Sequence, residues 1–141
     1  HYDTLLVSLS SEARVAVGDY AYASGILMGD VIEQDDNTAL VSLFSSPGRT
    51  RDVRVGNPSA IVVMHSVGGG SFVFEVPKKV SIEVGDSVVS AHDEQALIAI
   101  VQNIIDEPER TTLRVHAAAP LSLSDTNVIE FVRVSSQLNN L

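Results

Sequence analysis

Hydrophobic and polar residues alternate along much of this chain with a period of two, which is typical of strands that bury one face. RDVRV at 51–55 has both valines on one face, and SFVFEV at 71–76 has Phe72, Phe74 and Val76 on one face. Further segments are short, rich in β-branched or aromatic residues and bounded by turn residues: 38–44, 60–65, 111–117 and 127–134. Each predicts a strand.

Turn residues recur between the predicted strands. They are Asp35-Asp36-Asn37, Ser46-Pro47-Gly48, Gly56-Asn57-Pro58, Gly68-Gly69-Gly70, Gly85-Asp86, Asp106-Glu107-Pro108 and Ser124-Asp125-Thr126-Asn127. Glycine accepts a positive φ where the chain reverses, and Asp, Asn and Pro favour turns. Short strands between regular turns predict an all-β fold, built as two small six-stranded-type β-barrels or sandwich-like β units.

The beginning of the chain has a different pattern. In DTLLVSLSSEAR, Leu5, Leu6 and Leu9 fall on one side at helical spacing, with polar residues opposite. This predicts a short helix over residues 1–14.

Two stretches of the chain share one plan. Residues 15–47 and 82–120 each contain a Val-Gly-Asp turn, two apolar strands, an acidic turn, a Thr-led strand and a final proline. This weak repeat predicts two similar β units, residues 15–80 and 81–141, and leaves open whether the chain passes between them. The predicted structural turn residues are Gly18, Asp19, Pro47, Gly85, Asp86 and Pro120.

Residues 96–105 fit two structures. Ala96, Ala99, Ile100 and Asn103 share a helical face, whereas Leu97 to Ile105 also reads as a buried strand. The segment aligns with a strand of the first copy and leads into a tight acidic turn, so we favour a strand.

Composition narrows the classes of function. Of 141 residues, 45% are hydrophobic and 19% charged, as in globular proteins. A net charge of −9 disfavours nucleic acid and anionic membrane surfaces as direct partners. The absence of cysteine excludes disulfides, thiolate metal sites and cysteine nucleophiles. No apolar run approaches the roughly 20 residues that span a bilayer, and the sequence begins at His1, so we expect a soluble piece excised from an anchored protein.

Gly85-Asp86-Ser87 has the letters that precede the nucleophile in trypsin-like proteases. Such a serine needs glycine after it, so that backbone amides form an oxyanion hole, whereas Val88 and Val89 follow Ser87 here. We therefore interpret the motif as a tight turn and predict that the chain is not an enzyme.

Other candidate sites also fail on spacing. The histidines have no short metal-ligand spacing; they are His1, His65, His92 and His116. If Asp35 opened a calcium loop, Leu40 and Ser46 would stand where Gly and Glu are needed, so a hairpin turn is favoured. The glycines of SVGGGSF lead into a strand rather than a helix N-terminus. We predict no metal and no cofactor.

Taken in order, these segments resemble the extracytoplasmic β domain of the rod shape-determining protein family MreC. Residues 15–47 resemble its first β segment, including Gly25 and Gly29; VGGGSFVFEVP at 67–77 resembles the next, and IEVGDSVVSA at 82–91 its Gly-Asp turn. The resemblance covers residues 15 to 134.

The later part of the chain departs from the family pattern. HDEQALIAIVQNI, from His92, lacks the family's loop glycines and proline, and Ala99 stands where the family has Gly. TTLRVHAAAPLSLSDTNVIEFV then resembles the closing strands, with Pro120 in place.

The resemblance implies a scaffold rather than an enzyme. MreC-like proteins have a transmembrane helix, a dimerising coiled coil and two small β-barrels, and they link cell-wall synthases to the cytoskeleton from outside the cytoplasmic membrane. The implied partners are the chain itself, as a dimer or filament, and an elongation-specific penicillin-binding transpeptidase with other shape-complex membrane proteins. Residues 1–14 would end the coiled coil. Two alternatives remain at this point, a barrel adaptor domain of a membrane-fusion protein in efflux or secretion and a small hydrolase using Ser87.

Overall fold

The structure is a computed structural model that describes residues 3–92, 96–120 and 128–133. These residues form strands and turns, and no helix that could cross a membrane is found among them. The strands are β1 (Thr4–Ser8), β2 (Tyr20–Ala23), β3 (Ile26–Gln34), β4 (Thr38–Leu43), β5 (Thr50–Val55), β6 (Ala60–Gly68), β7 (Ser71–Pro77), β8 (Ser87–Ser90), β9 (Leu97–Ile105), β10 (Thr112–Ala118) and β11 (Glu130–Val132).

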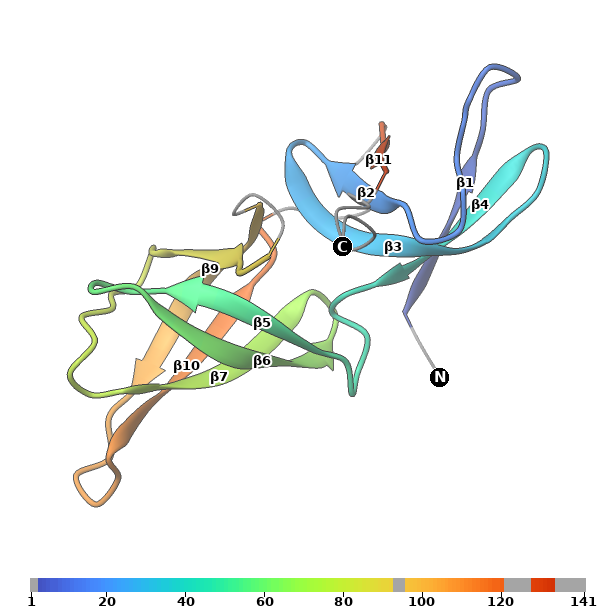
Figure 1. Cartoon of the computed structure of the whole chain (residues 1–141). Helices are drawn as coiled ribbons and strands as arrows, with labels where there is room; N and C mark the ends of the chain where they lie inside the picture. The colour runs from blue at the N-terminus through green and yellow to red at the C-terminus, as the bar shows by residue number, and fades with distance from the viewer. Residues whose placement is uncertain (1–2, 93–95, 121–127, 134–141) are drawn as a thin grey trace, which may run out of the picture.

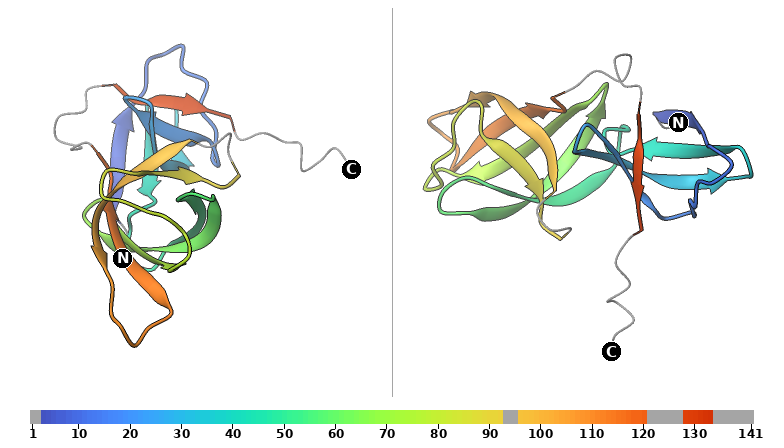
Figure 2. Two further views of the ribbon diagram at one scale, coloured as in Figure 1. Left: turned by 90° about the vertical axis from the view of Figure 1, so that its left-hand side faces the viewer. Right: turned by 90° about the horizontal axis from the view of Figure 1, so that it is seen from above.

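The strands form two β units that lie side by side (Figures 1 and 2). The first unit is a five-stranded sheet in the order β1-β4-β3-β2-β11, and the second is a closed barrel in the order β10-β7-β6-β5-β8-β9. Every strand pair is antiparallel. The prediction of an all-β fold in two units is confirmed. Only the second unit closes with six strands.

The predicted N-terminal helix is wrong. Residues 4–8 form β1, which pairs with β4 from Thr4↔Ser42 to Ser8↔Thr38. Leu5, Val7 and Leu9 are half-buried against the core of the first unit, whereas Leu6 is 66% exposed. The burial therefore follows a period of two, because pairing with β4 satisfies the backbone and places alternate side chains on the apolar face.

The boundary between the two units differs from the one predicted after residue 80. The first unit ends near Ser46, residues 50–118 form the barrel, and β11 then returns to the first unit. The repeat identifies the strand triplets β2-β3-β4 and β8-β9-β10, but the strands that flank each triplet come from elsewhere in the chain. The chain therefore does pass between the units.

Residues 97–105 form the strand β9, so the favoured interpretation of this segment is confirmed. β9 pairs with β10 and β8, and Ile98, Ala99 and Val101 are buried in the barrel. The helical alternative fails because both edges of this segment are taken up by neighbouring strands.

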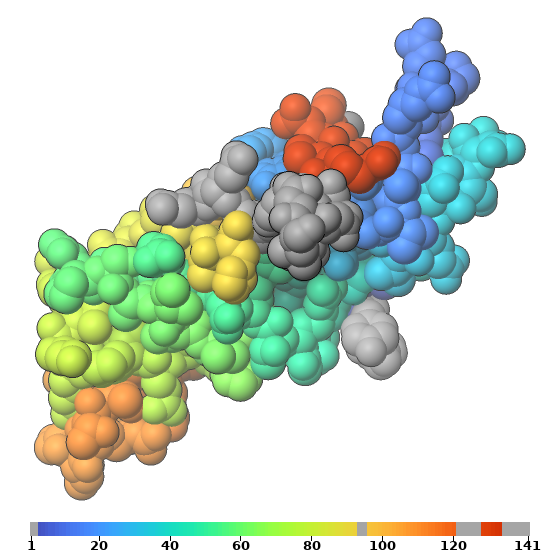
Figure 3. All heavy atoms as spheres, viewed as in Figure 1, coloured from blue at the N-terminus to red at the C-terminus, as the bar shows by residue number. Residues whose placement is uncertain are grey.

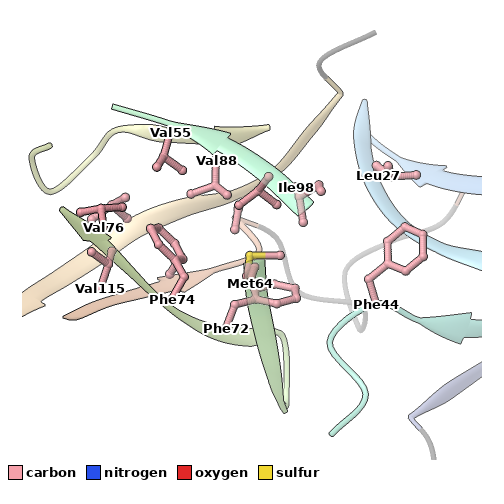
Figure 4. Close-up of a cluster of buried hydrophobic side chains, with 14 residues drawn as sticks. Leu27, Phe44, Val55, Met64, Phe72, Phe74, Val76, Val88, Ile98 and Val115 are labelled. Atoms are coloured by element: carbon pink, nitrogen blue, oxygen red, sulfur yellow. The ribbon is translucent and has the colours of Figure 1, made fainter. Parts of the chain in front are cut away.

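The barrel core is built from the inward faces of its strands. Val53 and Val55 of β5 and Phe72, Phe74 and Val76 of β7 are all buried, as their alternation predicts. Figure 4 shows that Leu27 and Phe44, which belong to the first unit, lie at one end of this cluster beyond Ile98 and Met64. The two units therefore share part of one hydrophobic core.

Candidate interaction surfaces

The first Val-Gly-Asp turn is held by its aspartate. Gly18 has a φ of 97°, and Asp19 Oδ2 accepts a hydrogen bond from the Ala16 amide at 2.9 Å. The Gly18 amide donates to the Val31 carbonyl at 2.8 Å, and the Val31 amide donates to the Asp19 carbonyl at 2.9 Å. The turn thereby joins the start of β2 to β3.

The second Val-Gly-Asp turn has the same bonds. Gly85 has a φ of 99°, and Asp86 Oδ2 accepts from the Glu83 amide at 2.9 Å. The Gly85 amide donates to the Val101 carbonyl at 2.9 Å, and the Val101 amide donates to the Asp86 carbonyl at 2.9 Å. Matching backbone geometry at corresponding residues gives the sequence repeat a structural counterpart.

The two aspartates differ in their surroundings. The Asp19 side chain is 3% exposed, and its Oδ1 forms an ion pair with Nε of Arg133 at 2.6 Å. Asp86 is half-buried. Arg133 follows β11, so this contact ties the returning end of the chain to the first turn.

The two prolines of the repeat also lie outside strands. Pro47 follows β4 in the connection to the barrel, where its ring lies beside Gly68, and Pro120 follows β10. Both positions suit a residue that cannot donate to a sheet ladder.

Arginines at the start of the barrel contact the first unit. Arg49 Nη1 lies 3.2 Å from Asp30 Oδ1 and donates to Ser42 Oγ at 2.9 Å. Arg51 Nη2 donates to the Tyr20 hydroxyl at 3.4 Å. These bonds join β5 to the first unit through charged and polar groups.

The same arginines stack on Phe44, which follows β4. The guanidinium carbons of Arg49 and Arg51 lie 4.8 Å and 4.4 Å from the centre of the Phe44 ring, and Tyr20 meets that ring edge-on at 6.1 Å. Cations over an aromatic face are attracted by its quadrupole. Phe44 is therefore held from both units.

The connection between the units is short and hydrogen-bonded. Ser46 Oγ both donates to the Asp3 carbonyl and accepts from the Asp3 amide, each at 2.9 Å. Ser66 Oγ of the barrel donates to the Phe44 carbonyl. In the space-filling view the segment after β4 lies at the junction of one continuous body (Figure 3). These contacts fix the orientation of one unit against the other.

In the part of the chain that the structure describes, no strand joins β1 to β11, the two edges of the first unit's sheet. A groove of about 460 Å³ lies there. Its lining residues are Leu5, Leu6, Val7, Ser8, Leu9, Ser10, Ala13, Val128, Ile129 and Phe131. None of these side chains is charged. A strand edge beside a groove lined by uncharged side chains is a site where another strand can pair.

The outer face of the barrel also exposes apolar side chains. Ile61, Val63 and Val67 of β6 are exposed. His65 and His116 both pair with Val73 and border a hollow of about 470 Å³ on this face, which also includes Glu75 and Arg114. The surface is therefore mixed, with histidines beside valines.

Glu75 on this face is tied to its neighbours. Hydrogen bonding from the Thr112 hydroxyl, at 2.5 Å, is the largest influence on the pKa of Glu75 and lowers it. Partial desolvation opposes this, and Arg110, at 3.2 Å, lowers the pKa further. Its negative charge is thus held by residues of the β9–β10 turn and β10.

The residues considered for chemistry are placed as follows. Ser87 is exposed at the start of β8, where it pairs with Ile100. Asp35 caps the hairpin between β3 and β4. Of the three glycines, Gly68 ends β6, and Gly69 and Gly70 form the turn to β7. Among the described residues, no three His, Asp or Glu side chains cluster around a possible metal position. His1 lies outside the described residues.

Sequence reasoning missed both the groove and the arginine contacts. The groove combines residues 5–13 with residues 128–131, which no local pattern connects. Alternation of Leu5, Val7 and Leu9 was the available signal for its first edge. The arginine contacts had a weaker signal, because Arg49 and Arg51 flank Thr50 directly after a proline turn.

Comparison of the sequence with protein-family models and with curated proteins gives no match. Comparison with solved structures gives matches to structures of MreC. MreC from Pseudomonas aeruginosa has a TM-score of 0.71 at 18% identity, covering 94% of this chain and 99% of that chain. MreC from Listeria monocytogenes has a TM-score of 0.68 at 16% identity, covering 96% and 78%. The major periplasmic domain of the cell shape-determining filament MreC has a TM-score of 0.59 at 17% identity, covering 94% and 96%.

The chain therefore has the fold seen in MreC structures over nearly its whole length. At the level of fold, the resemblance expected from the order of the motifs is confirmed. Sequence identities of 16 to 18% in these three structures place the similarity in the arrangement of strands rather than in particular side chains.

Proposed function

We propose that this chain is a non-catalytic, extracytoplasmic scaffold domain of the bacterial cell-elongation machinery, with a role like that of MreC. The observation that carries the proposal is the match of both β units together to MreC from Pseudomonas aeruginosa, over 94% of this chain and 99% of that one. Another similar structure is a periplasmic domain of a cell shape-determining filament, which supports the location and the role in cell shape.

A scaffold works by binding, and the surfaces described above suit binding. Among the described residues, β1 and β11 are sheet edges beside a groove lined by uncharged side chains, and β6 exposes Ile61, Val63 and Val67. Exposed apolar surface and free strand edges are features through which proteins associate. They support the proposal that the domain self-associates and binds a cell-wall transpeptidase.

The test uses the domain and the ectodomain of the elongation-specific transpeptidase from the same organism. Sedimentation of the domain alone measures self-association, and titration calorimetry measures binding to the transpeptidase. We expect concentration-dependent oligomers and saturable binding. A domain that stays monomeric at high concentration and does not bind the transpeptidase contradicts the proposal.

A further inference from the structure

The equivalence of the two Val-Gly-Asp turns extends to whole strands. β2, β3 and β4 follow the first turn as β8, β9 and β10 follow the second. The flanking strands correspond as well, because β1 pairs with β4 as β7 pairs with β10, and β11 pairs with β2 as β5 pairs with β8. Five strands of the first unit thus have counterparts in the barrel.

The barrel has one strand more than the first unit. β6 lies between β5 and β7 and closes the barrel by pairing with both. The counterparts of β5 and β7 are β11 and β1, and no strand of the described residues lies between them. The groove of about 460 Å³ occupies this position.

Residues at corresponding positions of β5 and β11 differ in how deeply they are buried. By register, Val53 and Val55 of β5 correspond to Ile129 and Phe131 at β11, since Arg54 pairs with Val89 as Glu130 pairs with Tyr22. Both valines are at most 2% exposed, whereas Ile129 and Phe131 are only half-buried.

The same difference holds at the other edge. Phe72 and Phe74 of β7, which are 3% and 2% exposed, correspond by register to Leu5 and Val7 of β1, which are half-buried. Apolar side chains on both edges of the groove are therefore more exposed than their counterparts in the barrel, which β6 covers.

The two edges also have the right direction for one inserted strand. Four successive antiparallel pairings separate β1 from β11, so these two strands run parallel to each other. A single strand can then lie antiparallel to both, as β6 does between β5 and β7.

We propose that this groove accepts one extended segment of a partner protein, which pairs with β1 and β11 in the position that β6 has in the barrel. The segment must be free on both of its edges. The edge strand β1 of a second folded copy has one edge already paired with β4, so it cannot fill the groove from both sides. An extended, unpaired peptide segment fulfils the condition.

Charge complementarity defines the chemistry of this segment. The chain carries a net charge of −9, yet none of the ten residues lining the groove is charged. A charged side chain pointing inward would be buried without a partner. β6 itself points Val62, Met64 and Ser66 inward. The partner segment is therefore one with uncharged, mostly apolar residues at alternate positions.

The inference rests on the proposed function only for the existence of a protein partner, and its test does not depend on cell shape. The probe is a synthetic peptide with the sequence of β6, Ala60 to Gly68, flanked by lysines for solubility and labelled for fluorescence anisotropy. We expect saturable binding. We also expect slower hydrogen exchange at backbone amides of both β1 and β11, measured by NMR.

Variants make the site specific. Val7→Asp places a carboxylate in the groove and is expected to weaken binding by about tenfold or more. Val17→Asp in the protein, at a position that is 62% exposed and outside the groove lining, is the matched control and should leave the affinity unchanged. A peptide with proline in place of Val63, next to its central Met64, loses a backbone donor and should bind at least about tenfold more weakly. This comparison does not depend on whether the Val7→Asp variant folds.

Several results would overturn the proposal. Protection on one edge alone would show surface pairing rather than insertion. Self-association of the chain that Val7→Asp abolishes would assign the groove to a second copy. Peptide binding that appears only after removal of residues 134–141 would show that the groove binds a segment of this chain instead of a partner. If the peptide does not bind but the transpeptidase binds normally, the groove is not a strand-binding site, and the proposed scaffold function is unaffected.

Discussion

Gly29 on β3 is a position where only glycine fits between two strands. A Cβ there would lie 2.3 Å from the Ser42 carbonyl oxygen and 2.9 Å from Val41 Cγ1. The carbonyl belongs to a paired strand and cannot move without disturbing the sheet. This requirement gives a physical reason for one of the glycines that the family resemblance singled out.

Gly29→Ala is expected to lower the free energy of unfolding by about 1–3 kcal/mol, because the added methyl overpacks the β3–β4 contact. Urea denaturation measures the change. Gly25→Ala is the comparison, since its φ is 80° but no atom lies within 4 Å of its Cβ position, so only backbone strain of about 1 kcal/mol acts. A Gly29→Ala variant as stable as the parent would contradict the close approach.

Asp35 links stability to pH at the β3–β4 hairpin. Its carboxylate accepts hydrogen bonds from the Asn37 and Thr38 amides, each at 2.9 Å, and from the Thr38 hydroxyl at 3.0 Å. These bonds, that from Asn37 first, lower the pKa of Asp35. A lowered pKa contributes stability above the ordinary pKa of the group, and this contribution is lost as pH falls through the lowered value.

We therefore expect Asp35→Ala to destabilise the chain at neutral pH and to cost progressively less as pH falls below the ordinary aspartate range. Denaturation of both proteins across acidic pH measures the difference. Asp36→Ala is the matched control, because no hydrogen bond to its carboxylate is found in the described part of the chain. An Asp35→Ala effect that does not vary with pH would contradict the hydrogen-bonded carboxylate.

At the scale of single elements, the N-terminal sequence fits both a helical and a strand pattern of apolar residues, and the two patterns predict different effects of mutations in β1. As a strand it half-buries Leu5 and exposes Leu6, whereas a helix would place the two on the same face. Leu5→Asp is expected to lower the free energy of unfolding by about 1–3 kcal/mol, since a carboxylate replaces apolar contacts, and Leu6→Asp by under about 0.5 kcal/mol. Equal losses on thermal or urea unfolding would favour the helical pattern.

Strands whose burial is two-sided or cleanly alternating were predictable from sequence. β5 and β7 have their valines and phenylalanines at strict alternation, and β9 was recognised because it repeats the plan of β3. β1 was not predicted, because Leu5, Leu6 and Leu9 fit a helical period and the residues that pair with it, Thr38 to Ser42, lie thirty or more positions away. Local periodicity cannot choose between structures when a distant partner provides the backbone hydrogen bonds.

The division into units was predictable in part. The repeat located both strand triplets, but pairing of β11 with β2 joins residues more than a hundred positions apart. The predicted turn residues lie at the ends of strands, while the groove arises only from the return of the chain. Sequence patterns report which faces are apolar, and long-range pairing decides what covers them.

At the scale of the whole molecule, Phe44 and Arg51 hold the units in one orientation. A double-mutant cycle of Phe44→Leu and Arg51→Met should give a coupling energy of about 0.5–2 kcal/mol, because each change removes the same stacking contact. Val76→Ala with Arg51→Met is the control, since Val76 lies at the opposite end of the core (Figure 4), and should be additive within about 0.5 kcal/mol. If the effects of Phe44→Leu and Arg51→Met are fully additive, the stacking contact does not stabilise the packing of the two units.

The central claim is that this domain has the scaffold role of MreC, and a domain exchange tests it most directly. The corresponding domain of Pseudomonas aeruginosa MreC is replaced by residues 3–133 of this chain, and cell length and width are measured after native MreC is depleted. A second chimera carrying Val41→Asp, at a fully buried position, controls for folding. The account predicts rod-shaped cells with the first chimera and rounded cells with the second. Rounded cells with both, despite normal amounts of the first chimera at the membrane, would contradict it.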